Sequence, residues 1–264
     1  MKSLHPEAAL RQVGLRPDDN ILIIGGPGSG KSRLIRYMVS AWSGSRRLIV
    51  PDLMGIHRDP SPGDWVQIRP ESSESELMHA LTGSASIYLP VPQSGHGFDI
   101  PRFVERVGDV VRHVPDTPPS VLVLDEAQYS GYGGEPSGHP LAFVQRRPDR
   151  KVPAAAELLH AALSMAGVGV PRALTARTRR RSLSVVVSVQ FLAQLSRIPT
   201  PAFDVVVIGR SSLPQEAEAA RSLAPRVLPP PASIQAMPIG QFFVVRRPGR
   251  RARHIARTDL PAGW

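Results

Sequence analysis

The sequence contains no cysteine, so the chain has no disulfide bond, no thiolate nucleophile and no cysteine-ligated metal site. This absence suits the reducing cytoplasm, where we expect the protein to act. No apolar run approaches the ~20 residues that a bilayer crossing requires. The segment from Met1 to Glu7 also lacks the apolar core of a signal peptide. We therefore expect a protein with no transmembrane segment.

Lysine is scarce, since only Lys2, Lys31 and Lys151 occur, and arginine supplies most of the positive charge. The formal net charge is nevertheless +10. A GC-rich genome would also raise the arginine content. An excess of this size favours a polyanionic partner such as nucleic acid.

The composition is that of a folded domain, with 42% hydrophobic and 20% charged residues in a chain of 264. Its 28 prolines and 22 glycines predict long loops. Apolar runs alternate with helix-compatible segments, which predicts an α/β fold with a mostly parallel central sheet flanked by helices. We expect residues 1–20 to be a lead-in and residues 21–264 to form a single domain, closed by a β-hairpin at about residues 241–257.

Hydrophobic periodicity and turn residues divide this domain into elements. A helix is expected to start at Ser73, which has capping-box spacing to Glu76. Three consecutive prolines at residues 229–231 predict a connector. The expected strands are residues 21–24, 47–52, 65–68, 87–91, 120–124, 182–190 and 203–209, and the expected helices are residues 7–13, 32–42, 73–81, 100–114, 154–166 and 215–223.

A glycine-rich segment after the first strand predicts a phosphate-binding loop. It matches G-x-x-x-x-G-K-[ST], the Walker A pattern, between a strand and a helix. Glycine lets the backbone turn its N–H groups onto phosphate oxygens at a helix N-terminus. A turn without a ligand is the alternative, which the complete motif in this context disfavours. The residues expected to bind ATP are Gly25, Gly26, Pro27, Gly28, Ser29, Gly30, Lys31 and Ser32.

Within this loop we expect Lys31 to meet the β- and γ-phosphates and the Ser32 hydroxyl to bind Mg²⁺. A second apolar run, residues 120–124, ends in Asp125 and Glu126, as a Walker B strand does. Asp125 would hold the Mg²⁺ shell, and Glu126 would orient and deprotonate the attacking water. Two solvated acids at an ordinary strand end are the alternative, but the upstream phosphate loop favours the catalytic interpretation.

Two further features have alternative interpretations. The strand expected at residues 182–190 ends in Gln190, whose amide either senses the γ-phosphate or caps the strand. The segment at about residues 129–153 is rich in glycine, proline and arginine, and is either a solvated insertion or a DNA-contacting loop. The candidate DNA contacts in this basic loop are Arg146, Arg147, Arg150 and Lys151.

The order of these motifs resembles that of the FtsK–HerA superfamily of ring-forming, DNA-pumping ATPases. The compact size resembles the genome-packaging ATPases of tailless viruses with an internal membrane. The resemblance covers roughly residues 20 to 258. Beyond the phosphate loop, it rests on Asp125-Glu126, on the run from basic residues at Arg177 into a strand ending at Gln190, and on the terminal segment Gly240 to Val245.

The resemblance implies a RecA-like P-loop fold, the roles given above for Lys31, Ser32, Asp125 and Glu126, and a sensor role for Gln190. It also implies a homo-oligomeric ring, which we expect to be a hexamer, with an arginine supplied in trans. Val189 departs from the pattern, because a threonine usually precedes the sensor glutamine. The leading candidates for the arginine in trans are Arg177 and Arg181.

The motifs and the resemblance leave three alternative functions. The first is a Mg²⁺-dependent ATPase that translocates double-stranded DNA, with packaging of a viral genome into a capsid as the expected process. Its partners would be DNA bound through the backbone and capsid or vertex proteins, in the host cytoplasm and at the virion vertex. The second is a P-loop motor for virion assembly, extrusion or conjugation-type secretion. The third is a nucleotide switch or a small-molecule kinase.

Overall fold

The structure is a computed structural model of the chain. It describes residues 6–52, 65–69, 71–90, 93–94, 97–98, 106–107, 109–110, 113, 118–125, 183–190, 203–246 and 252–255.

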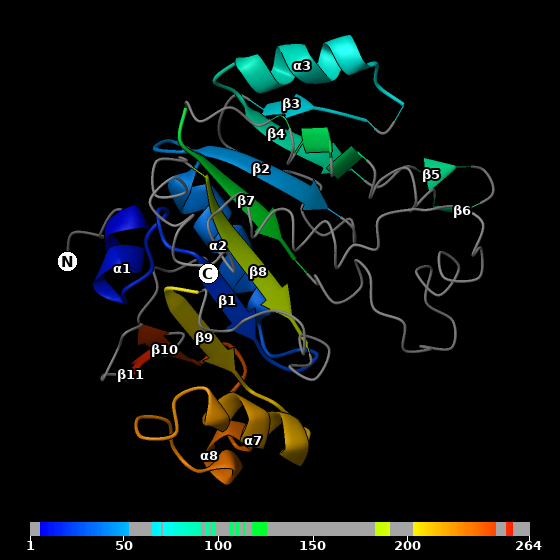
Figure 1. Cartoon of the computed structure of the whole chain (residues 1–264). Coiled ribbons are helices and arrows are strands. Elements are labelled where there is room, and N and C mark those ends of the chain that lie inside the picture. Colours follow the sequence, from blue (N-terminus) through cyan, green and yellow to red (C-terminus); the bar gives the residue numbers. More distant parts are fainter. Residues whose placement is uncertain are drawn as a thin grey trace, which may run out of the picture.

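Nine strands of this part of the chain form one sheet, in the order β11-β10-β9-β1-β8-β7-β2-β4-β3 (Figure 1). All neighbouring pairs from β9 to β3 are parallel, and β10 and β11 extend the sheet antiparallel. The mostly parallel α/β sheet predicted from the sequence is therefore confirmed. The strands are β1 (Ile21–Ile24), β2 (Arg47–Asp52), β3 (Trp65–Gln67), β4 (Ser86–Pro90), β7 (Ser120–Leu124), β8 (Leu183–Val189), β9 (Val205–Gly209), β10 (Phe242–Arg246) and β11 (Ala252–Ile255).

The helices agree with the predicted ones, with one exception. The capping box is present, because Ser73 Oγ accepts from the Glu76 amide and the Glu76 carboxylate accepts from the Ser73 amide. The predicted connector holds for residues 229 and 230, but α8 was not predicted and begins at Pro231, where the fixed φ of proline suits a first helical turn. The helices are α1 (Pro6–Gln12), α2 (Lys31–Trp42), α3 (Glu74–Thr82), α7 (Pro214–Ser222) and α8 (Pro231–Gln235).

The structure also contains a short strand pair and several helical residues outside the elements named above. A short antiparallel pair, β5 (Gln93–Ser94) with β6 (Gly97–Phe98), stands apart from the main sheet and was not predicted. Residues 106, 107, 109, 110 and 113 are helical, inside the helix predicted at 100–114. The helix predicted at 154–166 lies outside the described residues. None of the helices in the part that the structure describes has the length and apolarity of a membrane span.

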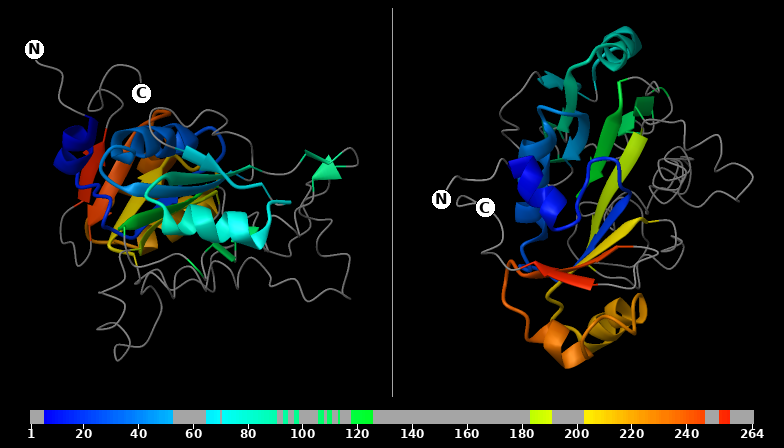
Figure 2. Two further views of the ribbon diagram at one scale, coloured as in Figure 1. Left: turned by 90° about the horizontal axis from the view of Figure 1, so that it is seen from above. Right: turned by 90° about the vertical axis from the view of Figure 1, so that its left-hand side faces the viewer.

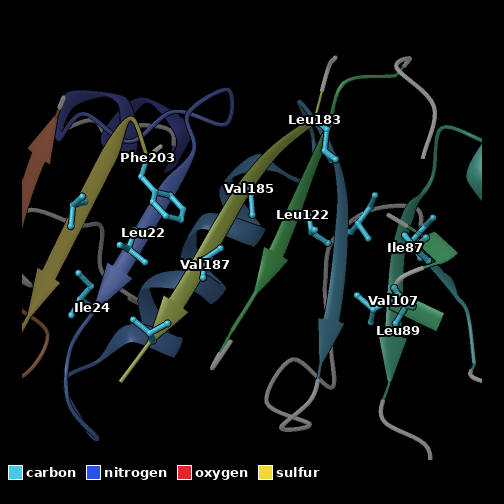
Figure 3. Close-up of a cluster of buried hydrophobic side chains, with 14 of the residues drawn as sticks. Leu22, Ile24, Ile87, Leu89, Val107, Leu122, Leu183, Val185, Val187 and Phe203 are labelled. Atoms are coloured by element: carbon cyan, nitrogen blue, oxygen red, sulfur yellow. The ribbon is translucent and has the colours of Figure 1, made fainter. Parts of the chain in front are cut away.

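The central strands of the sheet are almost entirely apolar, and both faces of the sheet are buried. Along β1, Leu22 and Ile24 join one hydrophobic cluster and Ile21 and Ile23 join the other. The first cluster, part of which is drawn in Figure 3, also takes apolar side chains from α3, α7 and α8. The second takes them from α1 and α2. Figure 2 accordingly shows α2 and α3 on opposite faces of the sheet.

The N-terminal segment packs onto the domain. Leu10 and Leu15 are fully buried in the same cluster as α2. Arg246 on β10 pairs with Asp19 and also donates to the Gly14 carbonyl at 3.1 Å. Burial raises the pKa of Asp19, and the Arg246 guanidinium opposes that shift. The segment before β1 is thus tied to the edge of the sheet that the C-terminal hairpin forms.

A buried arginine joins β2 to the end of α3. Arg47 is 3% exposed, and its guanidinium donates to the carbonyls of Leu81 at 2.8 Å, Ala80 at 2.9 Å and Ala85 at 3.2 Å. The carbonyls of the last helical turn have no partner within a helix. Arg47 therefore supplies three donors that α3 and the following loop would otherwise lack.

Replacement of Arg47 by methionine tests this contact. Arg47→Met should lower the free energy of unfolding by about 3 kcal/mol, because it leaves three carbonyls without their donors at roughly 1 kcal/mol each. Arg46→Met is the matched control, since Arg46 makes an exposed ion pair with Asp18 at 2.8 Å, and such pairs are worth at most about 1 kcal/mol. Urea denaturation measures both. An equal loss of unfolding free energy in the two variants would contradict the capping role of Arg47.

Candidate functional site

The strand order brings the predicted motifs together at one edge of the sheet. Strand β8 lies between β1 and β7, and all three strands are parallel. In this register Ile24 is opposite Val189, and Leu124 is opposite Val187. The phosphate loop, Gln190 and Asp125 each follow the carboxyl end of one of these strands, where open α/β sheets bind ligands.

The phosphate loop has the backbone that its glycines predicted. Gly28 and Gly30 have φ of 70° and 100°, in the left-handed region where a side chain is strained. Gly30 is also the N-cap of α2, so the loop leads directly into a helix N-terminus. A Cβ atom on Gly30 would lie 3.2 Å from Gly240 Cα, which leaves little room for any other residue. These features provide a cradle of backbone N–H groups suited to an anion.

Backbone hydrogen bonds from three places fix the loop. The Gly25 amide donates to the Val189 carbonyl on β8 at 3.3 Å. The Gly26 amide donates to the Arg210 carbonyl, just after β9, at 2.8 Å. The Gly240 amide, just before β10, donates to the Ser29 carbonyl at 3.0 Å. The loop is therefore held by the end of β8, by the residue after β9 and by the turn before β10.

Lys31 points back into the loop. Its side chain is buried, and Nζ donates to the carbonyls of Gly25 at 2.7 Å and Gly26 at 3.3 Å. Burial of an ammonium group is unfavourable unless its donors are satisfied. Phosphate oxygens are charged acceptors and bind an ammonium more strongly than carbonyls do. The position of Lys31 is therefore suited to exchanging these carbonyls for the phosphates of a nucleotide.

A serine on β8 holds the Walker B aspartate. Ser188 is fully buried, and its hydroxyl donates to Asp125 Oδ1, while Asp125 is itself buried at the end of β7. Sequence reasoning missed Ser188 and assigned the polar role on this strand to Gln190. The structure places Gln190 after the end of β8, where it is half-buried. The available signal was a pair of polar residues, Ser184 and Ser188, in a strand that is otherwise apolar.

Two side chains at this edge could hold Mg²⁺. Asp125 offers a carboxylate, and Ser32, the second residue of α2, offers a hydroxyl. The described residues contain no cluster of three or more histidine, aspartate or glutamate side chains that would hold a metal by themselves. Magnesium in nucleotide sites is bound by one or two protein ligands together with phosphates and water. The residues present therefore fit a magnesium ion that arrives with a nucleotide.

A further buried acid is the last residue of β2, at the same edge of the sheet. Asp52 is 2% exposed and accepts a hydrogen bond from the Tyr88 hydroxyl at 2.8 Å. Strands β8 and β7 separate it from the phosphate-loop strand. Its contact with Tyr88 links the end of β2 to the middle of β4.

Several predicted residues lie outside the described part of the chain. They comprise the expected base, the two candidate arginines of the neighbouring subunit and the four basic-loop residues. Their roles stay predictions. These residues are Glu126, Arg177, Arg181, Arg146, Arg147, Arg150 and Lys151.

The contact between Ser188 and Asp125 yields a test. Ser188→Ala should lower ATP turnover about 10- to 100-fold and raise the Mg²⁺ concentration required, because a carboxylate without its supporting hydrogen bond binds metal less well. Ser184→Ala is the matched control, since it removes a buried hydroxyl from the same strand that instead donates to the Pro17 carbonyl. Turnover is measured across a Mg²⁺ titration. Indistinguishable Mg²⁺ dependence in the two variants would refute the positioning role.

Comparisons with known proteins give similarity in structure alone. No known family model matches the sequence, and no curated protein is detectably similar to it. Among solved structures, the chain is similar to the genome-packaging NTPase B204 from Sulfolobus turreted icosahedral virus 2 in complex with AMPPCP. The TM-score is 0.53 at 15% identity, covering 91% of this chain and 98% of that one.

Two further structures show the same likeness. B204 from Sulfolobus turreted icosahedral virus, a DNA-packaging ATPase, has a TM-score of 0.53 at 17% identity, over 92% of this chain and 98% of that one. The bacterial conjugative coupling protein TrwB has a TM-score of 0.56 at 12% identity, over 90% of this chain and 84% of that one. The chain therefore has the fold of these nucleotide-binding proteins, the P-loop α/β fold that the resemblance implied.

Proposed function

We propose that this protein is a Mg²⁺-dependent ATPase that acts as a DNA motor. The observation that carries the ATPase proposal is the position of Lys31, buried in a left-handed glycine loop with Nζ on the loop's own carbonyls. A bound triphosphate would give this ammonium group stronger acceptors. The Asp125–Ser188 pair beside the loop adds the acid that such a site requires.

Each residue of the site has a separate task in this proposal. Lys31 neutralises charge on the β- and γ-phosphates, and the loop amides orient them. Ser32 and Asp125 hold Mg²⁺, which when bound offsets the charge that develops on the phosphates. Glu126, which follows Asp125 directly, accepts a proton from the attacking water. Gln190 is the polar group beside the γ-phosphate.

Double-stranded DNA is the proposed substrate of the motor. The net charge of +10 favours a polyanion, and the basic loop offers Arg146, Arg147, Arg150 and Lys151 to phosphates. A motor that moves over any sequence grips the backbone rather than the bases. The solved proteins of similar fold are a genome-packaging NTPase and a conjugative coupling protein. Their similarity supports a DNA-handling role here.

Packaging of a viral genome is the process we propose. The chain covers 98% of the packaging NTPase, which supports this process. We propose a hexameric ring in which Arg177 or Arg181 of one subunit completes the site of the next. An arginine of this kind is worth roughly 10³ to 10⁵ in turnover. Secretion or virion assembly is the second candidate, favoured by the similarity to TrwB.

One experiment separates these functions. ATP hydrolysis is measured with and without duplex DNA at several salt concentrations, alongside the mass of the assembly. We expect duplex DNA to stimulate turnover in a ring-forming protein. The apparent affinity should fall with salt at a slope of about −0.9 for each phosphate contact. Lys31→Ala should abolish turnover while leaving the circular dichroism spectrum unchanged, because Nζ donates to carbonyls of the phosphate loop itself and its loss leaves the strands and helices in place.

Each of the other outcomes excludes part of the proposal. Hydrolysis by Lys31→Ala near the wild-type rate would contradict the ATPase site. A ring whose rate of ATP hydrolysis does not change when duplex DNA is added would favour the assembly or secretion motor. A monomer whose rate does not change would favour the nucleotide switch or the kinase.

A further inference from the structure

Two exposed aliphatic side chains flank the phosphate loop. The large hydrophobic side chains exposed in the described part of the chain are Leu213, Ile239, Val66 and Met78. Leu213 and Ile239 are the most exposed of them, at 44% and 60%. Leu213 follows and Ile239 precedes a residue that contacts the loop. An exposed aliphatic group is common on a protein surface, so the location of this pair matters more than its exposure.

Leu213 belongs to the segment that follows β9. The Arg210 carbonyl of this segment accepts from the Gly26 amide, and a Cβ atom on Gly26 would lie 3.6 Å from Ser212 N. Leu213 comes next and is the N-cap residue of α7. An aliphatic side chain makes no capping hydrogen bond, so leucine is a poor choice for this helix start. The exposed side chain of Leu213 therefore has no capping role at the start of α7.

Ile239 belongs to the turn that precedes β10. The next residue, Gly240, donates its amide to the Ser29 carbonyl and packs against Gly30. Ile239 and Leu213 thus stand next to residues that touch positions 26 and 29–30 of the same short loop. They approach it from the β9 and β10 side of β1.

The opposite side of β1 is the side of the acid. β8 and β7 carry Ser188 and Asp125, and these strands follow β1 in one direction across the sheet, whereas β9 and β10 follow it in the other. A triphosphate whose γ end faces Asp125 directs its nucleoside end away from β8. The nucleoside would therefore leave the loop toward β9 and β10, where Leu213 and Ile239 are.

We propose that Leu213 and Ile239 form an apolar contact for the base of the bound nucleotide. This inference rests on the nucleotide site proposed above. A base has two flat faces, and contact of a face with aliphatic carbon stabilises the complex by about 25 cal/mol for each Å² of apolar surface removed from water. Neither side chain has a polar atom, so the contact does not read the hydrogen-bonding edge of the base. Adenine and guanine nucleotides should bind with similar affinity.

The test compares ATP with inorganic tripolyphosphate, which has the phosphates but no base. The dissociation constants of both ligands, and of GTP, are measured with Mg²⁺ by calorimetry. The double variant Leu213→Ser/Ile239→Ser should bind ATP and GTP on the order of tenfold more weakly, yet bind tripolyphosphate as the wild type does. Serine is a favoured N-cap residue, so the replacement of Leu213 should not weaken α7. Met78→Ser, an exposed apolar position on α3, is the matched control and should leave all three constants unchanged.

Three results would overturn the base contact. One is an unchanged ATP affinity in the double variant. Another is an equal loss for ATP and tripolyphosphate, because the side chains would then shape the loop instead of meeting the base. The third is a wild-type protein that binds ATP no better than tripolyphosphate. The nucleotide site itself fails in a different way, with neither ATP nor tripolyphosphate bound by the wild type.

Discussion

Three backbone hydrogen bonds hold the phosphate loop, and the proposed chemistry depends on them. They run from Gly25 to Val189, from Gly26 to Arg210 and from Gly240 to Ser29. None uses a side chain, so the positions of the partners are set by the sheet rather than by residue identity. The partners are in place because β8 and β9 pair with β1, and β10 pairs with β9. The order of the strands in the sheet thus determines where the backbone partners of the phosphate loop lie.

The insertion of β8 between β1 and β7 has a second consequence. It places Ser188 against Asp125 and brings the end of β8 next to the start of the loop. The side of β1 that faces β8 therefore contains the buried acid, while the side that faces β9 contains Leu213 and Ile239 in exposed positions. In the proposed complex this asymmetry would give a bound triphosphate a direction, with its γ-phosphate toward the acid and its base toward Leu213 and Ile239.

Local features of this chain could be predicted from sequence because they depend on near neighbours. The phosphate loop, the capping box of Ser73 and Glu76, and the hairpin that pairs β10 with β11 are examples. Ser188 and Arg47 were not predicted as functional or capping residues, because their partners lie 63 and 33 to 38 residues away. The start of α8 was missed because proline suits both a connector and a first helical turn. Strand order likewise depends on contacts between distant segments, so the sequence alone did not place β8 beside β1.

The most direct test of the account is a crystal structure of the protein with Mg²⁺ and a non-hydrolysable ATP analogue. The account predicts that Lys31 Nζ leaves the carbonyls of Gly25 and Gly26 for the phosphates, and that Ser32 and Asp125 lie at the metal. A nucleotide bound elsewhere, with Lys31 still on the loop carbonyls, would contradict it.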